Sequence, residues 1–246
     1  MSGHSKWSTI KREKGANDQK RGQIFTKLGK AITIAVKDGG GITDPDKNFK
    51  LRLTIDKARE ANMPKDNIKR ALLRHSANQG KLGGGGWKEV LYEGYGPFGI
   101  AIIIEAVTDN KKRTSQELKR VFERGGGRLA STGAVNYLFE RKGLIVIEKK
   151  DLTEDQVLEK ALEAGAEDLE ETEDGFEIFT EPQKLNQAKE KIKSFGLKII
   201  DSELSFRPKS TVSITGEEKA KKILKLMDAF ESLDDVQKVY ANFDLL

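Results

Sequence analysis

The chain has 246 residues, of which 37% are hydrophobic and 34% are charged, with a formal net charge of +5 at pH 7. Such a chain can bury a core in more than one domain, and it holds no apolar run long enough to span a membrane. The absence of cysteine excludes disulfides, thiolate zinc sites and cysteine nucleophiles, and with the lack of an apolar leader it predicts a cytoplasmic protein.

The charge is divided unevenly along the chain. Residues 1–80 contain 18 Lys and Arg against 8 Asp and Glu, whereas residues 151–205 contain 6 against 16. Residues 81–150 are again basic, and the charges of residues 206–246 cancel. We therefore expect polyanion binding in the front half and a different task for the acidic segment.

The N-terminal segment 3–25 reads GHSKWSTIKREKGANDQKRGQIF and combines six cations with a single tryptophan, Trp7. Clustered Lys and Arg would neutralise several phosphates, and the indole would stack on a base or a ribose. Two other interpretations are contact with an anionic membrane and a solvated tail. We expect no membrane partner, because the first helix keeps its cations opposite a face that the helix bundle must bury. The candidate nucleic-acid-binding residues are His4, Lys6, Trp7, Lys11, Arg12, Lys14, Lys20, Arg21, Lys27 and Lys30.

The first hydrophobic periodicity predicts a helix over residues 22–37, with Lys27 and Lys30 on the arc opposite its apolar face. Three consecutive glycines then end this helix. Two further helices are predicted, one over 46–62 and one whose first turn holds Pro64. The front of the chain is therefore a basic arm followed by a small three-helix module.

From Trp87 onward the periodicity is that of strands. Residues 89–93 and 100–107 flank the turn-rich GYGPFG and predict a hairpin. A helix capped by Asp109 and ended by a second run of three glycines follows, and residues 134–140 predict another strand.

The order of elements in residues 143–206 is βαββαβ, which is the ferredoxin-like arrangement. Its predicted strands are 144–148, 167–171, 176–180 and 198–205, and its predicted helices are 154–164 and 182–195. The remaining tail predicts a strand over 211–214, a helix over 217–232 and a strand over 236–241. If the βαββαβ unit is self-contained, the tail must pair with the strands of 87–140.

We therefore predict an α+β fold with an N-terminal three-helix domain and two α/β sandwich domains, the second domain being discontinuous. The predicted domains are 1–80, then 81–142 together with 207–246, and an inserted acidic domain over 143–206.

Two glycine-rich stretches invite a nucleotide-binding interpretation. GYGPFG (94–99) has the spacing of a dinucleotide fingerprint, but the segment after it is a strand where that fingerprint requires a helix. The GGGG before Trp87 lacks the Lys and Ser or Thr of a phosphate-binding loop. A hairpin and a linker are the favoured interpretations.

The chain offers few candidate catalytic residues, because His4 and His75 are its only histidines. Nothing places a catalytic triad, so we expect no enzyme, no cofactor, no metal and no small-molecule substrate. The acidic stretch 151–177 lacks a calcium-loop pattern and is best interpreted as a solvated face. The alternative is that it contacts basic protein or the basic front of the chain.

The helix after Asp109 carries a stripe of cations. Pairs with Glu on a solvated helix would account for them, and a second contact with a phosphate backbone is the alternative. The residues of this secondary set are Lys111, Lys112, Arg113, Arg120 and Arg124.

Several long motifs occur in the same order as in a known family. They are GHSKW (3–7), KRGQIFTKL (20–28), GGG (39–41), AREANMPKDNIKRA (58–71), YEGYGP (92–97) and TDNKKRT (108–114). With these motifs the chain resembles the YebC family over nearly its whole length. It departs from the family pattern at Ile42–Thr43, which lengthen a loop, at Phe49 in place of proline, and at Phe98 in place of glycine.

The resemblance implies a three-domain α+β protein without enzymatic activity. Members are described as probable transcriptional regulators that bind DNA, and others as translation factors that act on the ribosome, including relief of stalling on proline-rich stretches. The motif residues that carry over are His4, Lys6, Trp7, Lys11, Arg12, Lys20, Arg21 and Lys27. We expect a ribosome- or rRNA-associated translation factor, with a DNA-binding transcriptional regulator as the alternative.

Overall fold

The structure of the chain is a computed structural model that describes residues 18–78, 86–149, 152–172 and 175–245. The side chains of 18–20 and 74–78 are not part of the description. Two compact units are present. One contains the described residues up to Val135 together with Lys221–Val239, and the other contains Asn136–Ala220 with the chain from Tyr240.

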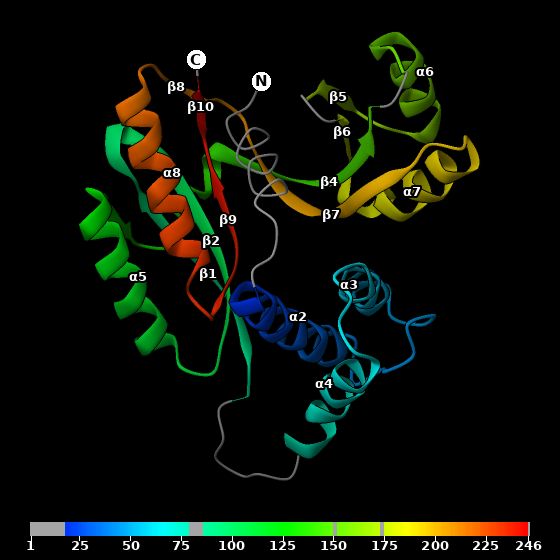
Figure 1. The fold of residues 1–246 in the computed structure, drawn as a ribbon, viewed down its shortest axis with the longest axis horizontal. Helices are drawn as coiled ribbons and strands as arrows, with labels where there is room; N and C mark the ends of the chain where they lie inside the picture. Colours follow the sequence, from blue (N-terminus) through cyan, green and yellow to red (C-terminus); the bar gives the residue numbers. More distant parts are fainter. Residues whose placement is uncertain (1–17, 79–85, 150–151, 173–174, 246) are drawn as a thin grey trace. The chain divides into compact units, whose positions relative to one another are not determined.

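Three helices form the N-terminal part of the first unit (Figure 1): α2 (Asp18–Asp38), α3 (Phe49–Glu60) and α4 (Lys65–Asn78). They share a core to which α2 contributes Ile32 and Val36 and α3 contributes Leu51 and Ile55. The predicted three-helix module is confirmed.

The turn between α2 and α3 explains the run of glycines. Asn48 caps α3 by accepting a hydrogen bond from the Leu51 amide, and its own amide donates to the Ala35 carbonyl at the end of α2. A Cβ atom on Gly39 would lie 2.2 Å from this Asn48 amide nitrogen. Gly40 has a φ of +69°, which favours glycine. The stop predicted at these glycines is thus a packing requirement as well as a conformational one.

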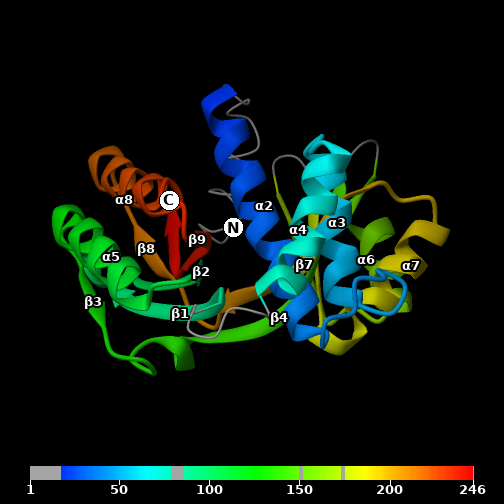
Figure 2. The ribbon, with the colours of Figure 1, turned by 90° about the horizontal axis from the view of Figure 1, so that it is seen from below.

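A four-stranded sheet forms the rest of the first unit, with the strand order β3-β1-β2-β9. Its strands are β1 (Lys88–Tyr95), β2 (Ala101–Thr108), β3 (Arg128–Ala130) and β9 (Val236–Ala241). Two helices, α5 (Lys111–Gly125) and α8 (Glu217–Glu231), lie side by side on one face of this sheet (Figures 1 and 2). Phe122 of α5 and Phe230 of α8 meet there with ring centroids 4.5 Å apart.

A second four-stranded sheet has the order β5-β6-β4-β7 and belongs to the other unit. Its strands are β4 (Phe139–Glu148), β5 (Asp168–Glu171), β6 (Gly175–Thr180) and β7 (Ile199–Pro208), with the helices α6 (Glu154–Ala164) and α7 (Leu185–Ser194). All neighbouring strands are antiparallel, and the order is that of a ferredoxin-like βαββαβ unit. A parallel pair, β8 (Val212–Ile214) with β10 (Phe243–Leu245), completes this unit.

The predicted α+β class is confirmed, and so is the pairing of the last predicted strand with the earlier sheet, because β9 lies beside β2. The other tail strand, β8, pairs instead with β10, which the sequence did not indicate. The three predicted domains with their boundaries stay a prediction.

The predicted strand at 134–140 is wrong. Residues 136–138 form a short 3-10 turn (η2), and β4 begins only at Phe139. The amides of Gly133 and Val135 donate to the Glu93 carboxylate at 2.7 and 2.8 Å, so this backbone is held by a side chain. Local pattern could not indicate this contact, because Glu93 lies about forty residues earlier in the chain.

Candidate nucleic-acid interface

Most of the predicted binding arm lies outside the described residues. This applies to His4, Lys6, Trp7, Lys11, Arg12 and Lys14, and to the side chain of Lys20. The described members of the set are Arg21, Lys27 and Lys30, which follow one another along α2. Arg21 is exposed.

Lys30 does not lie on a solvent-facing arc, so its predicted position was wrong. Its side chain is only 7% exposed, and its amine donates to the Asp235 carboxylate and to the Asp234 carbonyl, both at 2.8 Å. The same amine lies 4.7 Å from the centre of the Trp87 ring. The prediction assumed that α2 buries only its apolar face. The opposite arc, which carries Lys30, packs on the turn before β9 and is therefore buried as well.

Lys27 lies one turn earlier and contacts the same region. Its amine donates to the Glu231 carbonyl at the end of α8, at 2.5 Å. A cation at a helix C-terminus is favoured there because the last carbonyls of the helix have no partner within it. Through these hydrogen bonds, Lys27 and Lys30 hold α2 against the end of α8 and the turn before β9.

Asp235 is the centre of this contact and is 4% exposed. One carboxylate oxygen faces Lys30, while the other lies 2.7 Å from the Arg113 guanidinium and 2.8 Å from the Thr114 hydroxyl. Burial alone would raise the pKa of this carboxyl, but the hydrogen bonds from Lys30, Arg113 and Thr114 outweigh burial and lower the pKa to about 2. We call Asp235, Lys30, Arg113 and Thr114 the Asp235 cluster.

Arg113, one of the predicted secondary contacts, therefore has a structural partner. It also lies 3.0 Å from Asp109, and Asp235 holds the pKa of the guanidinium above its ordinary value. Asp109 was predicted to cap α5, but the capping side chain is Asn110, which accepts from the Arg113 amide. Asp109 instead forms an ion pair one turn along the helix.

The remaining cations of the secondary set stay on the surface. Lys111, Lys112, Arg120 and Arg124 of α5 are all exposed. Several other exposed cations of the first unit stood outside the predicted set, among them Arg128, Lys222 and Lys225. Lys222 and Lys225 come from the far end of the chain, and the packing of α8 beside α5 brings Lys222 close to the end of α5. Sequence motifs cannot pair segments that lie a hundred residues apart.

Helix α4 carries a second exposed basic face, with Lys65, Lys69 and Arg70. Arg70 contacts the side-chain oxygen of Asn67 one turn earlier. The connection from α3 bends at Asn62, whose φ is +58°, and Pro64 precedes the first residue of α4. Two helices of the first unit, α4 and α5, thus present Lys and Arg to solvent.

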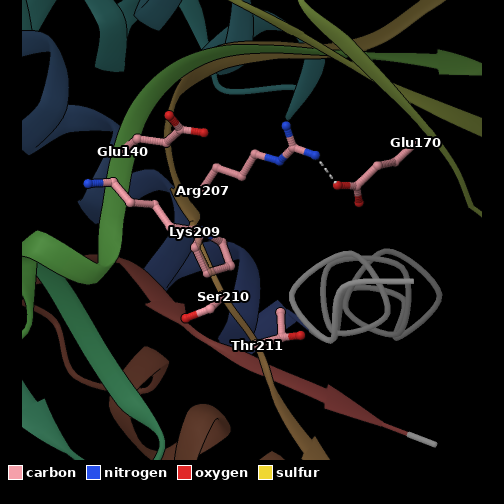
Figure 3. A pocket seen from close by; sticks show the side chains of 7 residues that line it. Glu140, Glu170, Arg207, Lys209, Ser210 and Thr211 are labelled. Carbon is pink, nitrogen blue, oxygen red and sulfur yellow. Dashed lines mark hydrogen bonds and ion pairs between the residues drawn. The ribbon is translucent and has the colours of Figure 1, made fainter.

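A pocket of about 340 Å³ lies in the second unit, at the end of β7 (Figure 3). Arg207 reaches from it to the Asp168 and Glu170 carboxylates at 2.6 and 2.5 Å and lies over the Phe179 ring at 4.2 Å. Burial alone would lower the pKa of this guanidinium, but these carboxylates raise it. Since Arg207 is already paired with two carboxylates and Glu140 also lines the pocket, the pocket is a poor phosphate site.

Neither a metal-binding group nor a membrane-spanning helix occurs in the described ranges of the chain. No group of three or more His, Asp and Glu is placed there to hold a metal ion. No helix among those residues combines the length and the apolarity that crossing a bilayer requires.

Comparison with known proteins gives the same family over both units. One family model, the TACO1/YebC protein N-terminal domain, matches residues 5–78, and another, the TACO1/YebC second and third domain, matches residues 87–243. The chain is 49% identical to a probable transcriptional regulatory protein of Persephonella marina, covering 100% of this chain and 96% of that protein. It is 46% identical to one of Desulfotalea psychrophila with the same coverage.

A solved structure supports the same assignment. The crystal structure of a conserved hypothetical protein of Aquifex aeolicus superposes with a TM-score of 0.84 at 43% identity, covering 93% of this chain and 92% of that one. The resemblance seen in the motifs is thereby confirmed. The chain belongs to the TACO1/YebC family.

Proposed function

We propose that this chain is a regulator of gene expression that binds nucleic acid without catalysing a reaction, and that its target is RNA of the ribosome. Family membership and the names of the relatives, probable transcriptional regulatory proteins, support a regulator. The observation that carries nucleic-acid binding is the pair of exposed basic helix faces on α4 and α5 in one unit. They add to the six cations of the arm.

Phosphate binding is the chemistry that suits these faces. Lys and Arg on solvated helices bind a polyanion by releasing its counterions, and such binding tolerates many sequences. Reading a DNA sequence would instead require amide or guanidinium groups aimed at base edges. On α4 the Asn67 amide oxygen already accepts a hydrogen bond from Arg70. This arrangement favours contact with a phosphate backbone over reading of a major groove by α4.

The proposal is tested by cosedimentation of the full-length protein with purified ribosomes, beside footprinting on promoter DNA, both across a salt titration. Neutralising Lys6, Lys11, Arg12 and Lys14 should flatten the log–log salt slope by about 0.7–0.9 for each phosphate that the arm no longer neutralises. Arg120→Gln with Arg124→Gln should flatten it further if α5 also binds phosphate.

The matched control replaces two exposed lysines of the acidic unit, Lys184→Gln with Lys193→Gln. Each of these already faces a carboxylate, Glu181 at 2.8 Å and Glu190 at 3.4 Å, so the salt slope should not change. Protection of promoter DNA without ribosome association would overturn the ribosomal target and favour a DNA-binding regulator. Absence of binding to either nucleic acid would overturn the proposal as a whole.

A further inference from the structure

The hairpin loop between β1 and β2 holds a residue in an unfavourable conformation. Phe98 has φ +63° and ψ +18°, the left-handed region in which a bulky side chain is an outlier. Glycine adopts this conformation without cost. Phe98 therefore carries backbone strain that a glycine would not.

The Phe98 ring is partly open to solvent. The residue is 44% exposed, whereas its neighbour Pro97 is buried. Residues held in sparsely populated backbone conformations are concentrated at functional sites. The exposed ring is therefore a candidate contact for a ligand.

One cation lies over this aromatic ring, and another lies over the ring of a nearby tyrosine. The Lys222 amine of α8 lies 5.7 Å from the centre of the Phe98 ring. On the nearby residue Tyr95, the Arg128 guanidinium lies 5.1 Å from the ring centre. A Cβ atom on Gly126 would be 3.1 Å from the Lys222 amine, so this corner of α5 leaves room for the lysine. Both cations are exposed.

We propose that Phe98 is a stacking platform for an unpaired nucleobase, and that Lys222 and Arg128 bind the adjoining phosphates. This inference rests on the proposed function. It adds a second site of contact with the nucleic acid, which is formed by residues of β1, β3, α8 and the Phe98 loop. An exposed aromatic ring with one cation beside it and another on a nearby ring matches the chemistry of single-stranded nucleic acid, in which a flat base alternates with an anionic backbone. An apolar protein partner would fit less well, since the charged groups would lose water without acquiring a counter-charge.

The experiment measures binding of the full-length protein to a labelled 12-nucleotide single-stranded RNA, to DNA of the same sequence and to an abasic oligonucleotide of equal charge. Phe98→Gly should weaken binding to the base-bearing strands by about fivefold or more and leave the abasic strand unchanged. Phe98→Tyr keeps a ring and should restore the affinity. Lys222→Gln should weaken binding to all three strands, because it removes a phosphate contact.

Two further measurements make the outcome decisive. Phe49→Ala removes another exposed phenylalanine, 37% exposed on α3, and should leave all affinities unchanged. The midpoint of urea unfolding of Phe98→Gly and of the wild type, measured beside the affinities, separates a loss of the stacking contact from a loss of folding. Equal affinities of the wild type and Phe98→Gly for the base-bearing strands would overturn the stacking platform alone. A wild-type protein that binds none of the strands would also overturn the stacking platform, whereas the proposed function is overturned only if the protein binds neither ribosomes nor promoter DNA.

Discussion

Each of the two units contains a charged residue that is surrounded by opposite charges, and the signs are reversed between the units. In the first unit the carboxylate of Asp235 faces Lys30 and Arg113, and its side chain is 5% exposed. In the second unit the guanidinium of Arg207 faces Asp168 and Glu170, and its side chain is 21% exposed. The ion-pair distances in the two units are similar, but Asp235 is shielded from water more completely than Arg207.

Exposure decides what such a cluster contributes. Removing one partner from a buried pair leaves a charge without water or counter-charge, whereas a surface charge regains hydration when its partner is removed. Ion-pair distance alone therefore does not rank these interactions. Asp235 should matter most, Arg207 less, and an exposed pair such as Lys184–Glu181 least.

Asp235→Asn should have the largest effect. The substitution leaves the Lys30 ammonium buried against a neutral amide, and loss of one partner from a buried pair costs about 3–5 kcal/mol. The free energy of unfolding, measured by urea titration at pH 7, should fall by about this amount. Asp234→Asn is the matched control, because Asp234 is exposed and Lys30 contacts only its carbonyl. A loss as small as that of the control would contradict the role of Asp235.

The contribution of the Asp235 cluster should also appear in the pH dependence of the unfolding free energy of the wild type. The folded-state pKa of Asp235 is about 2 against an ordinary value of 3.8, so this carboxylate stabilises the fold above pH 3.8. The stabilisation is lost as the pH falls through the folded pKa, and it amounts to about 2 kcal/mol. Between about pH 5 and about pH 2 the wild type should therefore lose about 2 kcal/mol more unfolding free energy than Asp235→Asn. Parallel pH profiles for the two proteins would contradict the lowered pKa.

Arg207→Gln should have an intermediate effect. It removes two charge-assisted hydrogen bonds and the contact with the Phe179 ring, but water can reach the carboxylates that remain. We expect a loss of about 1–2 kcal/mol in urea unfolding at pH 7. A loss equal to that of Asp235→Asn would show that exposure does not separate the two clusters.

Lys184→Gln should have the smallest effect. Its ion pair with Glu181, at 2.8 Å, is as short as the Lys30–Asp235 pair, yet its side chain is 51% exposed. The hydrogen bond from Lys184 to Glu181 raises the pKa of this lysine, but solvent screens the pair. No measurable change in unfolding free energy is expected. A measurable loss would mean that distance outweighs exposure after all.

Much of the fold could be predicted from local pattern. Helix α6 has the predicted bounds 154–164, because Thr153 and Gln156 form a capping box at its start and Gly165 adopts a left-handed conformation at its end. The bounds of β9 were also predicted, as 236–241. Strands β3 and β10, with three residues each, were missed, whereas the equally short β8 was predicted, because a segment of this length carries too little periodicity for a consistent prediction.

The candidate site could be predicted only in part. The identity and spacing of residues found the basic arm, the stripe on α5 and the family, since cationic composition and motifs are properties of the chain itself. Whether a given cation meets solvent or a carboxylate depends on contacts between distant segments. Lys30 and Asp235 are 205 residues apart in sequence, and Lys222 reaches the Phe98 loop only because α8 packs beside α5.

The sequence by itself thus determined the helices, most strands, the charge of each part and the family. Local backbone preference and hydrophobic period act over a few residues, so they can be recognised without a fold. Only the tertiary structure decided that Lys30 and Arg113 hold a buried carboxylate while Arg120 and Arg124 remain exposed. The physical reason is that solvation of a charge depends on every segment packed around it, including those far away along the chain.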